Sequence, residues 1–416
     1  MGNTSISLTK ATGGDARVLR FPERTGTGDP GVATLVLFDE HGRRIIDLPA
    51  EGEIRVEPTD GLGLTFDKHR PGEVTRFLES EEQGTYSWVS VESGELDDRD
   101  MSAIGRHDVR SLTLGWSGHD RYGRRHAKPI RYPTEPDRFA LLGSLAGLGV
   151  HSDSFGDEHL LSLSSRSGLR GLVLSGTAVT STGLAHSGLH RLEDLWLSDG
   201  ESFVDDLSFV RRLPTLESLT LRDPEMSDRH LRDLTVLPLL AELDVRYTRV
   251  GRFSLDVLSS LPRLHTLDLT GTRVGDDTVG TLEPIPGLRK LKLGDTMLTD
   301  AAVPLLGRLA HVDRLWLTRT AITDDGLAEL VRAKPALHTL DISQTRITVD
   351  GLRHLQHLPK LWRLEIAPSQ LTEEAVEMLA DTTTIDEIGL RGKLASLDLF
   401  GMIADYIGAA QTLPDV

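Results

Sequence analysis

A glycine-rich stretch near the N-terminus has the spacing of a nucleotide-binding loop. Gly26-Thr27-Gly28-Asp29-Pro30-Gly31 matches G-x-G-x-x-G, in which the glycines lie between a strand and a helix whose N-terminus holds the pyrophosphate. Here the glycines are followed by residues 32–38, an apolar run typical of a strand. We therefore interpret the glycines as a loop and predict no nucleotide cofactor.

Two histidine pairs and one acidic run have residue types that bind metal ions. His186 with His190, and His354 with His357, have helical spacing, but no Asp or Glu is placed to complete either site. The run Asp97-Asp98-Arg99-Asp100 lacks the spacing of a calcium loop and is interpreted as a solvated linker. The chain contains no Cys, which excludes thiolate ligands, disulfides and cysteine nucleophiles. The sequence therefore predicts neither a metal site nor another cofactor.

A basic segment interrupts an acidic chain. The formal net charge is -17, which disfavours a nucleic acid partner for the whole molecule, yet residues 101–140 carry 4 acidic and 8 basic side chains. Cations interleaved with tyrosines such as Tyr132 can contact phosphates or stack on bases, or they can form a solvated loop or pair with the acidic residues 1–98. Partner binding through residues 118–137 therefore stays open. The candidate residues are Arg121, Tyr122, Arg124, Arg125, Lys128 and Arg131.

The elements that position most of the chain's side chains come from an internal repeat. The pattern L-x-x-L-x-L, as in Leu192-Glu193-Asp194-Leu195-Trp196-Leu197, recurs every 23 to 25 residues with conservative replacements. Its alternating apolar residues predict one short strand in each unit. We expect each strand to begin within about two residues of the start of its unit. The units start at residues 145, 169, 192, 216, 240, 264, 288, 312, 337, 361 and 385.

The second half of each unit predicts a short helix. In Thr320-Ala321-Ile322-Thr323-Asp324-Asp325-Gly326-Leu327 the second Thr can cap a helix, and Asp in the first turn complements the helix dipole. In the next unit Leu352, Leu355 and Leu358 have helical spacing before Pro359 ends the element. Each unit is therefore predicted to be strand, turn, short helix and turn.

This repeat resembles the leucine-rich repeat family, specifically the T-x-I-T-D-x-G-L type that is similar to the cysteine-containing repeats of F-box proteins. The resemblance covers residues 145–393 and implies an α/β fold, a right-handed solenoid with strands on the concave face and short helices on the convex face. Where the family usually has Asn or Cys after the strand, this chain has Thr or Ser, and we expect these hydroxyls to donate to a neighbouring carbonyl and maintain the ladder between repeats. These residues are Thr177, Thr248, Thr272, Thr296, Thr320, Thr345 and Ser369.

The segments outside the repeats predict further parts. Residues 1–98 contain short apolar runs separated by turn signals and predict a small, mostly antiparallel β-domain, which resembles no family that we recognise. Residues 99–144 hold one more repeat-like strand, 109–114, and the basic insertion. Residues 394–416 predict a capping helix and tail, since open solenoid ends need cover; its apolar stripe is Leu399, Phe400, Ile403, Tyr406 and Ile407. The apolar runs of the N-terminal part are residues 32–38, 43–48, 53–56, 62–66 and 86–91.

The residues between the buried leucines of each strand are expected to point outward on the concave face. Two of them, Trp196 and Trp316, are aromatic, a type enriched at binding hot spots. Glu242, Asp244 and Asp268 are expected to form an acidic patch, with a basic patch beside it. Such a bipolar face suits a protein or peptide better than a uniform polyanion. The candidate partner-binding residues are Trp196, Arg222, Asp244, Arg246, Asp268, Lys290, Lys292, Arg314, Trp316 and Arg319.

The sequence therefore predicts a non-enzymatic recognition or adaptor protein that binds a protein or peptide partner. No apolar run predicts a membrane span or a signal peptide, so a cytoplasmic location is expected. Scarce Asn, and scarce Lys beside Arg, indicate a GC-rich bacterial source. Two alternatives stay open. One is a polyanion or nucleic acid binder that uses residues 118–137, and the other is an enzyme with an unrecognised site in the N-terminal domain.

Overall fold

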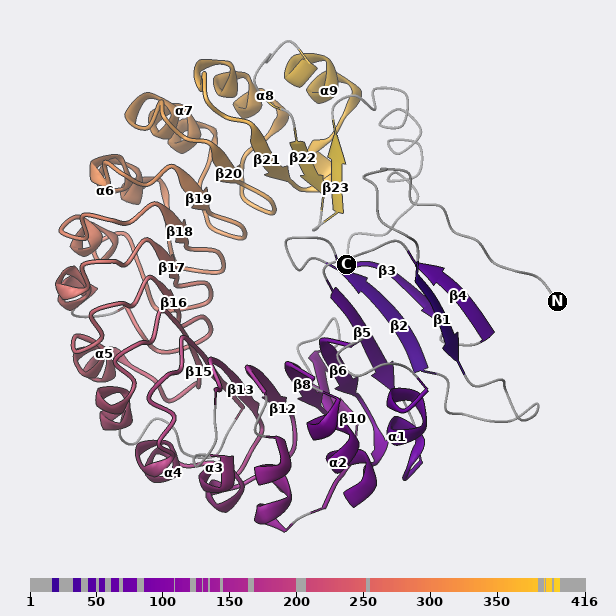
Figure 1. The fold of residues 1–416 in the computed structure, drawn as a ribbon. Helices are drawn as coiled ribbons and strands as arrows, with labels where there is room; N and C mark the ends of the chain where they lie inside the picture. The colour runs from indigo at the N-terminus through magenta and orange to yellow at the C-terminus, as the bar shows by residue number, and fades with distance from the viewer. Residues whose placement is uncertain are drawn as a thin grey trace. The chain divides into compact units, whose positions relative to one another are not determined.

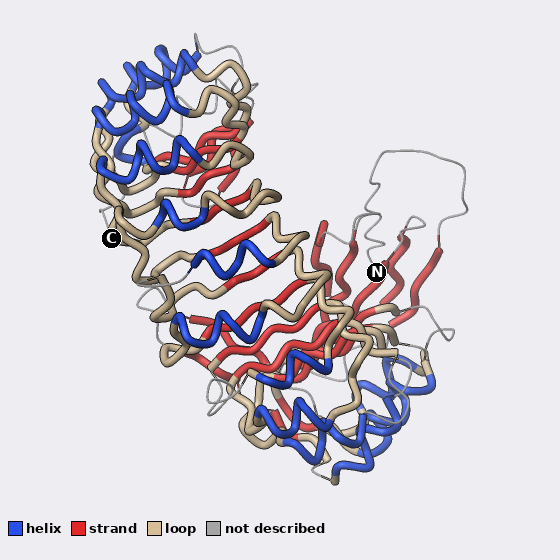
Figure 2. Tube along the Cα trace, turned by 90° about the vertical axis from the view of Figure 1, so that its left-hand side faces the viewer, coloured by secondary structure: helices blue, strands red, loops and turns tan. Residues whose placement is uncertain are grey.

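In a computed structural model, the chain forms two compact units, residues 1–216 and 217–416, which we describe separately (Figures 1 and 2). The structure describes residues 17–21, 33–38, 44–49, 52–56, 61–66, 70–80, 86–107, 109–119, 125–128, 130–133, 135–142, 145–163, 168–199, 207–251, 255–380, 385, 387–390 and 393–396. The helix predicted from Leu399 to Ile407 lies outside these residues. The start of that predicted cap is a strand, because Lys393–Ser396 (β23) pairs antiparallel with Glu387–Leu390 (β22).

The first unit begins with antiparallel strands. β1 (Arg17–Phe21) pairs with β4 (Gly52–Val56). β2 (Ala33–Phe38) lies between β3 (Arg44–Pro49) and β5 (Gly61–Phe66) and is antiparallel to both. The apolar runs at these positions thus form the predicted strands, and β1 is a strand that the sequence did not suggest.

The sheet then continues in parallel. β5 pairs with β6 (Trp88–Val91), and each later strand adds at the same edge in matching register. The repeat-like strand predicted at residues 109–114 is confirmed as β8, which lies between β6 and the first predicted repeat strand. Parallel pairing therefore begins before residue 98. The domain boundary predicted between residues 98 and 99 stays a prediction. The added strands are β8 (Ser111–Leu114), β12 (Gly147–Val150), β13 (Gly171–Ser175) and β14 (Asp194–Ser198).

Two helices of this unit are absent from the sequence prediction, α1 (Glu73–Leu78) and α2 (Asp98–Arg106). Asp97 caps α2, and the buried carboxylate of Asp100 accepts hydrogen bonds from the backbone N–H groups of Gly72 (2.7 Å) and Thr75 (2.8 Å). The interpretation of residues 97–100 as a solvated linker is therefore wrong, since Asp100 joins the two helices. The other helices are η1 (Pro136–Leu142), α3 (Asp157–Leu163), α4 (Ser181–His186) and η2 (Ser208–Arg212).

The basic insertion contains short strands. β9 (Trp116–His119) and β10 (Arg125–Lys128) form an antiparallel pair. β11 (Ile130–Arg131) pairs in parallel with β7 (Gly94–Glu95). The second half of the insertion is thereby attached to the segment that precedes α2.

The second unit carries one strand in every repeat. From β12 to β22, in both compact units, each strand begins two residues after the predicted start of its repeat. The expectation from the 24-residue spacing is therefore confirmed. The central leucines are in register, for example Leu243 with Leu267 and Leu291 with Leu315, and all are buried. The strands are β15 (Ser218–Arg222), β16 (Glu242–Asp244), β17 (Thr266–Asp268), β18 (Lys290–Lys292), β19 (Arg314–Trp316), β20 (Thr339–Asp341), β21 (Arg363–Ile366) and β22.

Helices of the second unit lie along one face of its sheet, and among the described residues no helix covers the opposite face (Figures 1 and 2). Several are 3-10 turns, because a unit of 24 residues leaves little length for a full α-helix. They are α5 (Asp228–Leu234), η3 (Leu255–Ser260), η4 (Val279–Leu282), η5 (Asp300–Ala302), α6 (Val303–Arg308), α7 (Asp324–Ala333), α8 (Val349–Leu352), η6 (Arg353–His357), η7 (Pro368–Gln370) and α9 (Glu373–Ala380).

An Asp near the helix start of one repeat and a Thr at the same place in the next repeat form a clamp between consecutive repeats. The Asp300 carboxylate accepts hydrogen bonds from the backbone N–H (2.8 Å) and the hydroxyl (2.5 Å) of Thr323 in the next unit. Gly326 makes room for this carboxylate, since a Cβ at that position would collide with the Asp300 side chain. The same bidentate pair recurs as Asp157 with Thr180, Asp276 with Thr299 and Asp324 with Thr348.

The threonines after the strands donate hydrogen bonds to carbonyls of their own repeat. The hydroxyl of Thr272 donates to the carbonyl of Leu269 (2.5 Å), and that of Thr320 donates to the carbonyl of Leu317 (2.6 Å). The expectation that these hydroxyls maintain a ladder between repeats is therefore wrong at these positions. Backbone hydrogen bonds and the Asp–Thr clamp join consecutive repeats instead. Thr248, Thr296 and Thr345 make the same bond three residues back.

Candidate protein-binding surface

The uncovered face of the second unit carries the side chains that alternate with the buried leucines. On β19, Leu315 is fully buried while Trp316 is half-buried. The strand register aligns Trp316 with Lys292 on one side and with Asp341 on the other. The strand parity predicted from the sequence is thus confirmed here, and one row of polar and aromatic side chains crosses the strands.

Five charged residues of this face form a continuous chain of ion pairs from β15 to β18, which we call the charged chain. Asp244 lies 2.9 Å from Arg222 and 2.7 Å from Arg246. Asp268 lies 3.0 Å from Arg246 and 3.2 Å from Lys292. The expected segregation into an acidic and a basic patch is therefore wrong for these residues, because each carboxylate lies between two cations.

Burial and pairing act in opposite directions on the charged chain. Burial acts to raise the pKa of Asp244, but the hydrogen bonds from Arg246 and the charge of Arg222 outweigh it and hold that pKa below its ordinary value. Burial likewise acts to lower the pKa of Arg246, and the carboxylates of Asp244 and Asp268 reverse the effect. Both groups are ionised at neutral pH, and the pairs hold their side chains in place.

The charged chain ends against an aromatic ring. The Lys292 ammonium lies 5.7 Å from the centre of the Trp316 ring, a distance at which a cation is attracted to the ring face. Lys292 therefore contacts both a buried carboxylate and a partly exposed tryptophan. This places the tryptophan in a defined orientation at the edge of a charged surface.

Asp341 follows Trp316 in the row and titrates abnormally. Burial raises the pKa of Asp341 to about 6, and the negative charge of Glu365 on the next strand adds to the effect. Its carboxylate accepts hydrogen bonds from the backbone N–H (2.9 Å) and the hydroxyl (2.6 Å) of Ser343, which oppose the rise in pKa. Asp341 was absent from the predicted site. The 24-residue spacing already aligned Asp341 with Glu365 on the next strand. Two adjacent carboxylates were the sequence signal that could have pointed to a raised pKa.

The remaining predicted residues of this unit occupy different surroundings. Lys290 is partly exposed on β18, and Arg314 lies beside it on β19 with half of its side chain exposed. Arg319 lies beyond the strand in a left-handed backbone conformation (φ 55°) and contacts Gln344 and Asp295. Arg319 is therefore separate from Lys290 and Arg314, which lie side by side on the strands.

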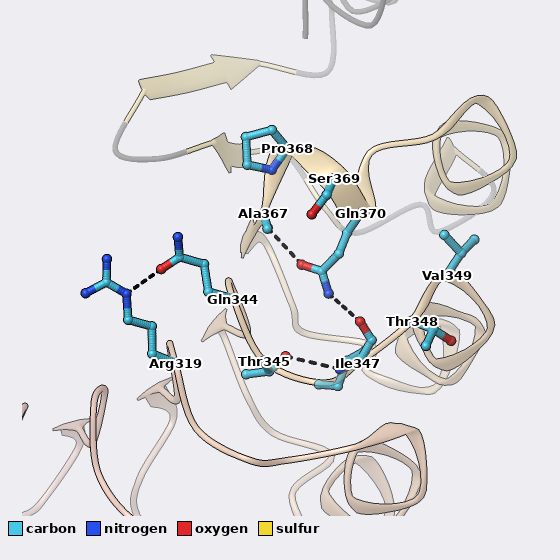
Figure 3. Close-up of a pocket in the computed structure, with 10 residues that line it drawn as sticks. All are labelled: Arg319, Gln344, Thr345, Ile347, Thr348, Val349, Ala367, Pro368, Ser369 and Gln370. Carbon is cyan, nitrogen blue, oxygen red and sulfur yellow. Dashed lines mark hydrogen bonds between the residues drawn. The ribbon is translucent and has the colours of Figure 1, made fainter. Parts of the chain in front are cut away.

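A pocket of about 730 Å³ opens next to Arg319 (Figure 3). Gln370 crosses it, since its amide accepts a hydrogen bond from the Ala367 N–H and donates one to the Ile347 carbonyl. Both the oxygen and the nitrogen of this amide are thus used within the fold, and the pocket lies between turns of neighbouring repeats of the second unit. Its lining residues are Arg319, Gln344, Thr345, Ile347, Thr348, Val349, Ala367, Pro368, Ser369 and Gln370.

The structure describes only some of the candidate partner-binding residues of the first unit. Trp196 is half-buried on β14. Arg125 and Lys128 lie on β10, Arg131 is exposed on β11, and Arg121, Tyr122 and Arg124 lie outside the described residues.

Tyr132, which the sequence offered as a surface aromatic in the insertion, is buried with its ring 5.6 Å from that of Phe139. Its hydroxyl accepts a hydrogen bond from Ser154 (2.9 Å), and burial raises its pKa. Tyr132 belongs to the core and offers no ring for stacking on a base.

The first histidine pair makes local hydrogen bonds. The Nδ1 atom of His186 lies 2.8 Å from the Thr182 carbonyl, and that of His190 lies 2.7 Å from the Gly188 carbonyl. Within the described ranges, no group of three His, Asp or Glu side chains is arranged to hold a metal ion. No helix among them has the length and apolar character needed to cross a membrane.

Comparisons with known proteins find similar solved structures only. No family model and no curated protein matches the chain. The crystal structure of an internalin from Listeria monocytogenes has a TM-score of 0.46 at 15% identity, covering 76% of this chain and 90% of that one. A plant peptide hormone receptor, RGFR1, in complex with RGF2, has a TM-score of 0.40 at 11% identity and coverages of 77% and 57%.

The mouse RP105/MD-1 complex has a TM-score of 0.44 at 15% identity and coverages of 74% and 67%. These likenesses are low. The fold follows from the chain itself, in which units of about 24 residues each supply one parallel strand and a short helix or turn, in register with the next unit. The chain therefore has the leucine-rich repeat fold.

Proposed function

We propose that this chain is a non-enzymatic recognition protein that binds a protein partner through the uncovered sheet face of residues 217–416. One observation carries the proposal. Trp316 is partly exposed on that face, with the Lys292 ammonium over its ring and the charged chain beside it. A partly buried aromatic side chain next to ordered charges is typical of the anchor residues of protein interfaces.

The ion pairs of the charged chain favour binding over catalysis. Asp244, Asp268, Arg246 and Lys292 are paired with one another. A general acid or base needs a group free to exchange a proton with a substrate, whereas these ion pairs fix side chains in a pattern that a partner can recognise. Ordered charges contribute more to the choice of partner than to raw affinity.

Site-specific photo-cross-linking tests this proposal in a lysate of the native host. A benzophenone amino acid replaces Glu242, which is exposed on β16, or Glu329, which is exposed on α7. Proteins captured from position 242 and not from position 329 are identified by mass spectrometry and purified. Their affinity is then measured for the unmodified chain and for Trp316→Ala.

We expect Trp316→Ala to weaken binding of such a partner about thirtyfold or more, the effect of losing a 2 kcal/mol anchor. A partner that binds both forms equally would contradict the proposal. Residues 118–137 would then become the leading candidate site, and a steep loss of affinity with salt would identify a polyanion. A cytoplasmic adaptor role is the finer form of this proposal, and fractionation of the host with an antibody checks the location.

A further inference from the structure

A narrow cationic surface lies on two adjacent strands of the second unit. Lys290 and Lys292 lie on β18, and Arg314 and Trp316 lie on β19. The strand register pairs Lys290 with Arg314 and Lys292 with Trp316. Residues two apart on a strand point to the same face, so these four side chains form one surface, which we call the β18–β19 surface.

Among the described residues, one cation of this surface has no ion pair and a second has only a distant one. Lys292 shares Asp268 with Arg246. Lys290 makes no ion pair with any described residue, and Arg314, with 50% of its side chain exposed, approaches the Asp313 carboxylate only to 3.9 Å. Adjacent strands lie about 4.8 Å apart, so Lys290 and Arg314 repel each other unless an anion lies between them.

Carboxylates bound this surface on both sides. Towards β16 lie the exposed Glu242 and Asp268, which is paired with Arg246 and Lys292. Towards β21 lie Asp341 and Glu365, which is paired with Arg363. The cationic surface is therefore only two strands wide. A long polyanion that crossed the strands would meet Glu242 on one side and Asp341 on the other, whereas a single acidic side chain fits.

The spacing between Arg314 and Trp316 along β19 suits a second contact with a bound peptide. Arg314 and Trp316 are two residues apart, about 6.6 Å along the strand. An extended peptide presents alternate side chains at the same spacing, and the Trp316 ring offers an apolar contact beside the two cations.

On the basis of the function proposed above, we infer that the β18–β19 surface binds an extended segment of the partner protein. That segment carries an acidic residue and, two positions away, an apolar residue. The acidic side chain lies between Lys290 and Arg314, and the apolar one packs on Trp316.

Four pools of fluorescein-labelled nonapeptides test this inference with the full chain, by fluorescence anisotropy. The central three residues are Glu-x-Leu, Gln-x-Leu, Lys-x-Leu or Glu-x-Ser, and the other positions are randomised among small polar residues. We expect the Glu-x-Leu pool to bind at least tenfold more tightly than each of the others. The double variant Lys290→Glu with Arg314→Glu should reverse the order and favour the Lys-x-Leu pool.

Arg273→Glu is the matched control, since it reverses an exposed arginine outside the strands and should leave the preference unchanged. If the double variant fails to fold, the milder Lys290→Gln with Arg314→Gln should bind the Glu-x-Leu and Gln-x-Leu pools equally. Equal binding of all pools by the unmodified chain overturns the inference, as does tighter binding of a single-stranded oligonucleotide. If the pools bind equally but Trp316→Ala still loses the cross-linked partner, the inference fails and the proposed function stands.

Discussion

Leu315 and Trp316 are neighbours on β19, but their side chains face opposite sides of the sheet. Leu315 is fully buried, so Leu315→Ala should lower the free energy of unfolding by about 2–5 kcal/mol through lost burial and a residual cavity. Trp316 is half-buried and contacts Lys292, so Trp316→Ala should lower it by about 1 kcal/mol. Urea unfolding followed by circular dichroism measures both. Equal losses for the two variants would mean that the assigned strand parity is wrong.

Asp341 makes stability depend on pH in an unusual direction. The folded chain raises the pKa of this carboxyl from 3.8 to about 6, so the folded state binds the proton more tightly than the unfolded state. The contribution of Asp341 to the free energy of unfolding is therefore most favourable below pH 4 and is lost as pH rises through 6. Asp341→Asn keeps the acceptor for Ser343 without the charge and should raise stability at pH 7.5 by roughly 1–3 kcal/mol.

Thermal unfolding at pH 7.5 and pH 4.5 checks this effect, with Asp325→Asn on the exposed side of α7 as a control. The gain from Asp341→Asn should shrink at pH 4.5, because the native side chain is then largely neutral. The control should change little at either pH. A gain of the same size at both pH values would show that charge burial is not its cause.

At the scale of the element, the Asp–Thr clamp explains the glycine at the start of three helices, Gly183, Gly326 and Gly351, where a Cβ would collide with the clamping carboxylate. Asp300→Ala removes two hydrogen bonds to Thr323 and should cost about 1–3 kcal/mol. Gly326→Ala places a methyl group against the Asp300 carboxylate and should also destabilise. In the Asp300→Ala background Gly326→Ala should cost much less, because the colliding carboxylate is gone.

Chemical denaturation of the two single variants and the double variant measures this coupling. Strict additivity of the two losses would contradict the clamp. Thr235→Ala supplies a control, since its hydroxyl donates only to the Arg232 carbonyl of its own helix and its loss should not couple to Gly326.

The sequence predicted the repeated elements well because their signal is periodic. Every strand from β12 to β22 begins two residues after the apolar residue that opens its repeat. The helices α1 and α2 have no repeated pattern, and the role of Asp100 depends on a contact with Gly72 that is distant in sequence. Which carboxylate pairs with which cation depends on side-chain positions across strands. The alternation of side chains along a strand placed Asp244 and Arg246 on one face. It could not show that the two side chains form an ion pair.

At the scale of the whole molecule, the chain forms two compact units, and in the second the parallel strands of consecutive repeats pair in register. In such an array, stability is close to a sum of repeat and nearest-neighbour contributions. A repeat in residues 217–416 therefore depends mainly on the strands that flank it, as β17 does on β16 and β18. A partner seated on β18 and β19 would stabilise the same local group of repeats.

This locality can be tested with a core substitution in each unit. Leu267 and Leu172 are both buried on their strands, β17 and β13. Leu267→Ala leaves a cavity between repeats, so hydrogen exchange should rise most in β16 to β18 and least in residues 61–114. Leu172→Ala should give the opposite pattern, with the rise centred on β12 to β14. Exchange measured by mass spectrometry resolves these segments. If either variant raised exchange equally along the whole chain, the two units would unfold as one cooperative body, and binding at β18–β19 would stabilise the N-terminal strands as much as the repeats beside it.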